Sequence, residues 1–152
     1  AGATGPGTDD GVFAALPVEV ERVFAWRDGL WDVYSSGSSF VQIDEVRTGD
    51  GLWVFLRNER SVIWTYERAP YISTLLRPGW QMVAWPGPSV PIADALRFTP
   101  AAVESLFAWG ALESAFTIYR TAQPQVADLN ALAHLDAVWV LVGEDGGAWP
   151  GP

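Results

Sequence analysis

The sequence predicts a mainly β protein, built as two degenerate copies of a small β-sandwich or partly open barrel repeat with short helices. Short runs of aromatic and β-branched residues are bounded by Gly, Asp, Asn and Ser, which is typical of half-buried strands. Turn signals separate these runs at intervals of about ten residues, as in sandwiches and barrels. One block of residues also recurs in the second half of the chain.

The recurring block reads Val-Glu-x-x-Phe-Ala-Trp and occupies residues 20–26 and 103–109. Self-similarity of this kind predicts one supersecondary unit used twice. Further correspondences join residues 31–34 with 116–119, and join Ile43, Val46, Asp50, Trp53, Val54 and Trp64 with Leu129, Leu132, Asp136, Trp139, Val140 and Trp149.

The repeat divides the chain into a first copy at residues 1–66, a linker or turn at 67–78, and a second copy at 79–152. The second copy opens with a predicted strand that has no counterpart in the first. A β unit that lacks one strand exposes unpaired backbone groups along its edge. We therefore expect something outside the first copy to cover that edge.

Alternating apolar residues predict strands at 23–26, 30–34, 52–56 and 62–66, and in the second copy at 81–85, 106–109, 115–120 and 137–142. A tight turn is expected at 47–51, where Gly allows positive φ. Thr99, Pro100 and Glu104 form a helix-start pattern over 99–104. Residues 92–96 and 126–132 are each expected to form one or two helical turns.

The composition restricts the partners of the chain. Hydrophobic residues make up 49% of the sequence, with nine Trp, and charged residues only 18%, so much apolar surface must be hidden in the fold, against a partner or against another copy. The net charge is −9 and all nine basic residues are scattered Arg, which argues against nucleic acid and anionic lipid. No apolar run approaches the roughly 20 residues needed for membrane insertion.

The first residues, Ala1, Gly2, Ala3 and Thr4, include no initiator Met and are small, as around signal-peptidase cleavage sites. This pattern predicts an exported chain, extracellular or at the cell surface. The alternative is a slice of a longer protein. The absence of Cys excludes disulfides and thiolate chemistry but does not identify the compartment.

The run from Gly79 to Trp85, followed by Phe107-Ala108-Trp109 and Asp136-Ala137-Val138-Trp139-Val140, resembles a tandem β-rich repeat of secreted and surface proteins of bacteria and archaea. Members of that family read "GWNL(I/V)…VYAYD…W…Y…L..L..G.GYWV". The first copy lacks the opening Gly-Trp strand, and the second has Ala-Leu-Glu where an Asp/Gly turn is expected. The resemblance implies extracellular modules in tandem, often beside adhesive or structural domains, without established chemistry.

We expect no enzymatic activity, no cofactor and no metal site. The only His, His134, has no partner at metal or nucleophile spacing, so we interpret it as structural. Adjacent acids on a strand point to opposite faces, and the acid pairs lie beside turn residues, so we interpret them as solvated loops rather than glycosidase carboxylates or calcium ligands. These pairs are Asp9-Asp10, Asp44-Glu45 and Glu144-Asp145.

Two functional hypotheses follow. The first is an extracellular structural subunit that assembles with copies of itself into a filament, tube or surface layer, through strand addition or edge packing. The alternative is a carbohydrate-binding or adhesion module that presents a row of Trp and Tyr to a polysaccharide. Trp26, Trp53, Trp109 and Trp139 are expected in the core. The candidate interface residues are Ala1, Gly2, Ala3, Thr4, Trp31, Trp64, Tyr66, Tyr71, Trp80 and Trp149.

Overall fold

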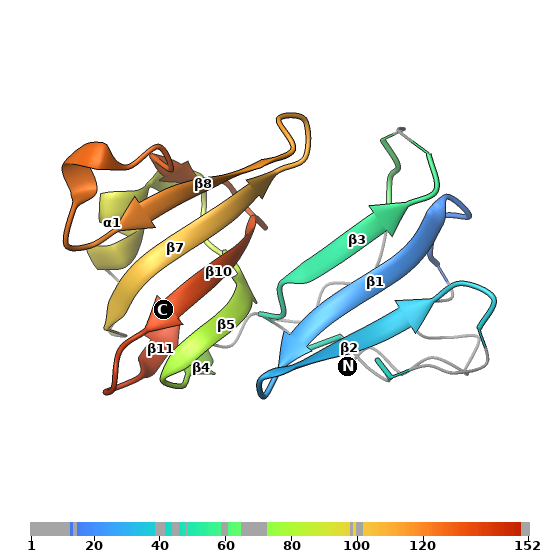
Figure 1. The fold of residues 1–152 in the computed structure, drawn as a ribbon, viewed down its shortest axis with the longest axis horizontal. Coiled ribbons are helices and arrows are strands. Elements are labelled where there is room, and N and C mark those ends of the chain that lie inside the picture. The colour runs from blue at the N-terminus through green and yellow to red at the C-terminus, as the bar shows by residue number, and fades with distance from the viewer. Residues whose placement is uncertain are drawn as a thin grey trace.

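The structure, a computed structural model, describes residues 13, 15–38, 42–43, 46–47, 49–58, 61–64, 73–97, 99 and 102–149. The fold is mainly β, as the sequence predicts, with antiparallel sheets and little helix (Figure 1). The first half of the chain forms one of the two larger sheets, and the second half forms the other.

The first sheet has the strand order β2-β1-β3, with β1 at Val20–Arg27, β2 at Leu30–Ser35 and β3 at Leu52–Leu56. Asp28 and Gly29 join β1 to β2, and both have positive φ, which matches a two-residue type I′ hairpin turn. One face of this sheet packs on a core of five buried residues: Phe13, Val20, Val23, Ala25 and Ile43.

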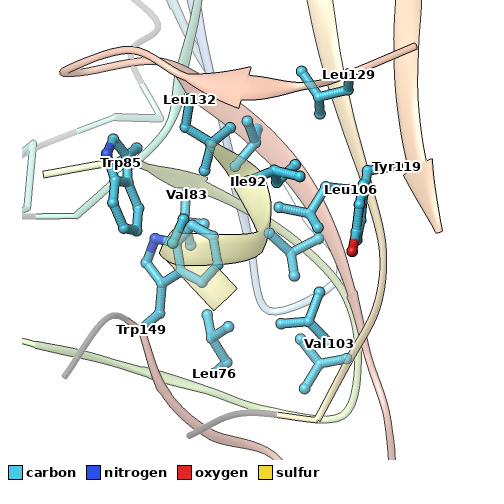
Figure 2. Close-up of a cluster of buried hydrophobic side chains, with 14 residues drawn as sticks. Leu76, Val83, Trp85, Ile92, Val103, Leu106, Tyr119, Leu129, Leu132 and Trp149 are labelled. Atoms are coloured by element: carbon cyan, nitrogen blue, oxygen red, sulfur yellow. The ribbon is translucent and has the colours of Figure 1, made fainter. Parts of the chain in front are cut away.

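The second sheet has the order β5-β10-β7-β8, with β5 at Gly79–Ala84, β7 at Val103–Gly110, β8 at Ala115–Arg120 and β10 at Ala137–Val142. Its core, shown in Figure 2, includes Leu106 and Leu132 together with the packed rings of Trp85 and Trp149. Helix α1 (Ile92–Arg97) contributes Ile92 and Ala95 to it. Two short sheets pair β4 (Thr74–Leu76) with β11 (Gly147–Trp149) and β6 (Val90–Pro91) with β9 (Ala131–Leu132).

The two larger sheets have the same strand pairing at the positions that the sequence comparison aligns. Phe24 of β1 lies opposite Trp53, and Phe107 of β7 lies opposite Trp139. The register shifts between Val20 and Arg22 in β1, and β7 carries a shift at the same place, between its residues 103 and 105. Thus β1, β2 and β3 occupy the same relative places as β7, β8 and β10.

The helix predicted at 99–104 is wrong. Helix α1, which confirms the prediction at 92–96, ends at Arg97, and the Thr99 hydroxyl donates to the carbonyl oxygen of Ala95 at 3.0 Å. Proline disfavours helical φ/ψ for the residue that precedes it, so Thr99 follows the end of α1 and does not begin a new helix. Glu104 belongs to β7, because pairing with β10 outweighs a local helix signal.

Several other boundaries also differ from the sequence predictions. Residues 126–132 form no helical turns beyond the 3₁₀ turn at Pro124–Val126. Strand β4 lies inside the predicted linker at 67–78, so the second unit begins before residue 79. Residues 61–64 are not in a strand, and 65–66 lie outside the described residues. In the second unit β11 pairs with β4; among the described residues of the first half no strand corresponds to β4.

Candidate functional site

Aromatic side chains cover the faces of both sheets that point away from the cores. In β1, Val23 and Ala25 lie in the core, so the alternate residues Phe24 and Trp26 lie on the other face. In β7, Leu106 lies in the core and Phe107 lies on the other face. Each strand is therefore apolar on both sides.

The two aromatic faces contact each other. The ring centroid of Trp139 lies 5.4 Å from that of Trp26 and 5.5 Å from that of Trp31, and Trp53 lies 5.7 Å from Trp109. Such tilted and edge-on pairs are favourable by about 0.5–1.5 kcal/mol each beyond the area they bury. The expectation that Trp26, Trp53, Trp109 and Trp139 lie in the core is wrong: none belongs to either buried cluster, and together they form a layer between the sheets.

This layer does not cover the aromatic face of the first sheet completely. Phe24, Trp31, Trp53 and Phe55 line an open groove of about 390 Å³. Phe55 is 53% exposed and Trp31 is 37% exposed, so solvent reaches the lining. The groove is therefore a candidate place for contact with a partner.

The groove lies beside β3, which pairs with a strand along one of its two edges only. Among the described residues, β3 pairs as a strand only with β1. Just before β3, the Ala84 N–H donates to the Gly49 carbonyl oxygen and the Gly51 N–H donates to that of Met82. A Cβ at Gly51 would lie 2.9 Å from the Val83 nitrogen, so only glycine permits this approach. Beyond Gly51 the outer edge of β3 continues without a partner strand in this part of the chain.

The equivalent edge of the second sheet is covered. Strand β5 pairs with β10 along six residues on each strand, from Ala137 opposite Ala84 to Val142 opposite Gly79. It also places the Trp80 ring 5.3 Å from Phe107. In the part of the chain that the structure describes, the first sheet has no such fourth strand, and Phe24, which occupies the place of Phe107 in β1, borders the groove.

Polar contacts fix the start of β3 within the first half and join β1 to β5 of the second half. The Arg27 guanidinium, in a side chain only 12% exposed, pairs with the Asp50 carboxylate, which also accepts from the Arg47 N–H. The Trp26 indole N–H donates to the Trp80 carbonyl oxygen at 3.1 Å. The ion pair holds the residue just before β3 against β1, and the indole hydrogen bond holds β1 against β5.

The predicted interface residues that the structure describes are exposed, half-buried or fully buried, and the others are not described. Ala1, Gly2, Ala3, Thr4, Tyr66 and Tyr71 lie outside the described residues. Trp31 and Trp80 are exposed on the aromatic faces. Trp64 is half-buried, with its ring 6.4 Å from that of Phe13. Trp149 is fully buried and donates its indole N–H to the Ala84 carbonyl oxygen, so it belongs to the core and offers no surface to a partner.

The sequence interpretation missed Phe24, Trp53 and Phe55 as surface residues. One signal could have identified them. Strand β3 consists of Leu52-Trp53-Val54-Phe55-Leu56, which is apolar on both faces. A strand that is apolar on both faces is normally buried on both faces. The recurring Trp residues explain the burial of only one face of β3.

The remaining polar candidates are dispersed. His134 Nδ1 lies 2.9 Å from the Gly87 carbonyl oxygen, and Glu144 and Asp145 are exposed in the turn after β10. The pairs Asp9-Asp10 and Asp44-Glu45 lie outside the described residues. Within the described ranges, His, Asp and Glu side chains form no group of three that could hold a metal ion, and no helix has the length and apolarity needed to cross a bilayer.

The free edge of β3 and the apolar groove beside it are therefore the features from which a function is argued. Compared with protein-family models, with curated proteins and with solved structures, the chain matches none.

Proposed function

We propose that this chain is an extracellular structural subunit that assembles with copies of itself through the β3 edge of its first sheet, within a filament, tube or surface layer. One observation carries the proposal: among the described residues the β3 edge has no partner strand, whereas β5 covers the equivalent edge of β10. The extracellular location follows from a second part of the proposal, that both halves belong to the tandem β-rich repeat of bacterial and archaeal surface proteins.

The residue types of β3 support pairing with another chain. Soluble proteins protect edge strands with Lys, Pro, bulges or a covering element. The five residues of β3 include no charge and no Pro. The Phe55 side chain is exposed on the same face as the groove. Pairing this apolar edge with another strand is therefore favourable, because the edge otherwise exposes apolar side chains and unpaired backbone groups to water.

The lining of the groove supports a protein strand as its occupant. Small-molecule sites combine apolar walls with a few polar groups that orient the ligand, and the four lining residues here are all apolar. A strand added to an edge gains main-chain hydrogen bonds and places alternate side chains in adjacent pockets. The second sheet shows such an arrangement in β5, whose Trp80 packs on Phe107.

We expect Phe55→Lys to weaken self-association by at least about tenfold, because an interface anchor is replaced by a charge that must be desolvated. The free energy of unfolding of the monomer should change little, since Phe55 is already exposed. Sedimentation velocity over a wide concentration range measures the association. The wild type should form larger species that dissociate on dilution.

Leu112→Lys is the matched control, because Leu112 is 95% exposed in the turn between β7 and β8 and the charge change is the same. This variant should associate like the wild type. Equal weakening by both variants would show that added charge, not the β3 edge, controls association. A wild type that stays monomeric at every concentration would refute self-assembly.

Carbohydrate binding is a second candidate function. It is favoured by three exposed indoles on the aromatic faces, Trp31, Trp80 and Trp109, at 37%, 44% and 40% exposure, because sugar rings stack on such surfaces. In that case soluble glucans, mannans or chitin oligosaccharides should quench the Trp fluorescence saturably, and Trp80→Ala should reduce the effect. The absence of saturable quenching across these sugars would discard this candidate.

A further inference from the structure

We propose that the strand on the β3 edge is β3 of a second copy, running antiparallel, with Val54 of one copy opposite Val54 of the other. This inference rests on the proposed function and specifies it further, since it identifies the contributing strand, its direction and its register. It is drawn from the order of side chains in β3 and from the two faces on which they lie.

The sequence of β3 is complementary to itself when one copy is reversed. It reads Leu, aromatic, Val, aromatic, Leu from either end. In the proposed register Trp53 of each copy lies opposite Phe55 of the other, and Leu52 lies opposite Leu56. Cross-strand aromatic and aliphatic pairs each contribute about 0.2–1 kcal/mol relative to Ala pairs, so this register pairs every side chain with one of its own kind.

The faces of the strand agree with the same register. Leu52, Val54 and Leu56 pack against the first core, and Trp53 and Phe55 line the groove on the opposite face. A two-fold axis perpendicular to the sheet joins core face to core face and groove face to groove face. A one-residue slip would place each side chain beside one from the opposite face, so the second copy would be turned over.

The proposed pairing begins at a defined residue of β3 and gives a closed dimer. The Gly51 N–H already donates to the Met82 carbonyl oxygen, so the shared edge begins at Leu52. The three-stranded sheets of two copies then form one six-stranded sheet, and Phe55 of the second copy completes the groove beside Trp53. Because an isologous contact closes on itself, this contact makes a dimer, and any longer assembly needs another surface of that dimer.

The negative net charge of each copy disfavours association, although the contact between the two β3 strands contains no charged residue. The net charge is −9 per chain, whereas β3 carries no charged residue and Asp50, just before it, is paired with Arg27. Repulsion of this kind is screened by salt. We therefore expect the dimer to strengthen as ionic strength rises.

Disulfide cross-linking tests the register, because the chain contains no Cys of its own. Val54→Cys, incubated with oxidised glutathione, should convert most of the chain to a covalent dimer. Opposite Cα atoms of antiparallel strands are about 4.5–5.5 Å apart, within the range of about 4.4–6.8 Å that a disulfide spans. Leu52→Cys and Leu56→Cys should each cross-link no more than Leu112→Cys, whereas the double variant Leu52→Cys/Leu56→Cys should form the dimer again.

A dimer yield from Val54→Cys no higher than from Leu112→Cys would overturn the proposed register. If the wild type nevertheless self-associates in sedimentation, the proposed function stands and this inference alone fails. If the wild type is a monomer throughout, both fail. Should Val54→Cys not fold, hydrogen exchange of the wild type decides: the amides of residues 52–56 should gain protection as concentration rises, and protection gained only elsewhere would contradict the inference.

Discussion

Replacing Trp149 with Ala is expected to lower the free energy of unfolding by about 3–5 kcal/mol, the range for large aromatic residues in a core. Trp149 is completely buried, packs its ring against Trp85 with centroids 5.7 Å apart, and donates a hydrogen bond to the Ala84 carbonyl oxygen. The substitution therefore removes the ring contact and the hydrogen bond and leaves a cavity. Urea unfolding followed by circular dichroism measures the loss.

Trp64→Ala provides the control, because the repeat makes Trp64 equivalent to Trp149 while the structure leaves it half-buried. We expect a distinctly smaller loss of stability in this variant. Equal losses would mean that Trp64 is as deeply packed as Trp149. A loss under about 1 kcal/mol for Trp149→Ala, within the ordinary range of point mutations, would contradict the core described above.

Trp139→Ala is expected to have the second largest effect, about 2–4 kcal/mol, since it deletes a large, partly buried ring. Trp139 belongs to the second sheet but contacts Trp26 and Trp31 of the first. Its removal should also weaken the coupling between the halves, so that one calorimetric transition separates into two. Differential scanning calorimetry records both effects.

Trp80→Ala distinguishes coupling from simple loss of packing. The Trp80 ring contacts Phe107 of its own sheet, and its backbone carbonyl, which accepts from Trp26, is retained in the variant. This variant should lose stability but unfold in one transition. Two transitions in Trp80→Ala, or a single transition in Trp139→Ala, would show that the aromatic layer does not couple the sheets.

Strands rich in β-branched and aromatic residues could be predicted from the sequence alone. The predictions at 52–56, 115–120 and 137–142 are confirmed with the same bounds, because β-branched and aromatic residues favour pleated, packed positions. The predicted helix at 99–104 failed because a helix-start pattern is a local preference, and pairing between β7 and β10 overrides it. Residues 62–64 of the strand predicted at 62–66 pair with no other strand among the described residues.

The sequence comparison pointed to the first sheet as the place of the site, but it did not identify the residues that line the groove. Comparison of the two halves predicted that the first lacks one strand; among the described residues the first sheet has three strands and the second has four. The groove residues Phe24, Trp53 and Phe55 were not predicted, because equivalence in a repeat identifies the position of a Trp but not the face it occupies. Trp149 and Trp80 illustrate this: both were candidate interface residues, and one is fully buried while the other is 44% exposed.

The sequence by itself determined the mainly β class and three strands with their bounds, since the type and order of side chains along a strand depend only on the sequence. Only the tertiary structure decided that the recurring Trp residues join two sheets instead of filling a core, and that the apolar groove lies beside the edge of β3. The physical reason is that a strand apolar on both faces can bury either one first. That choice depends on which distant segments, here Phe13 and Ile43 on one side and Trp139 on the other, reach each face.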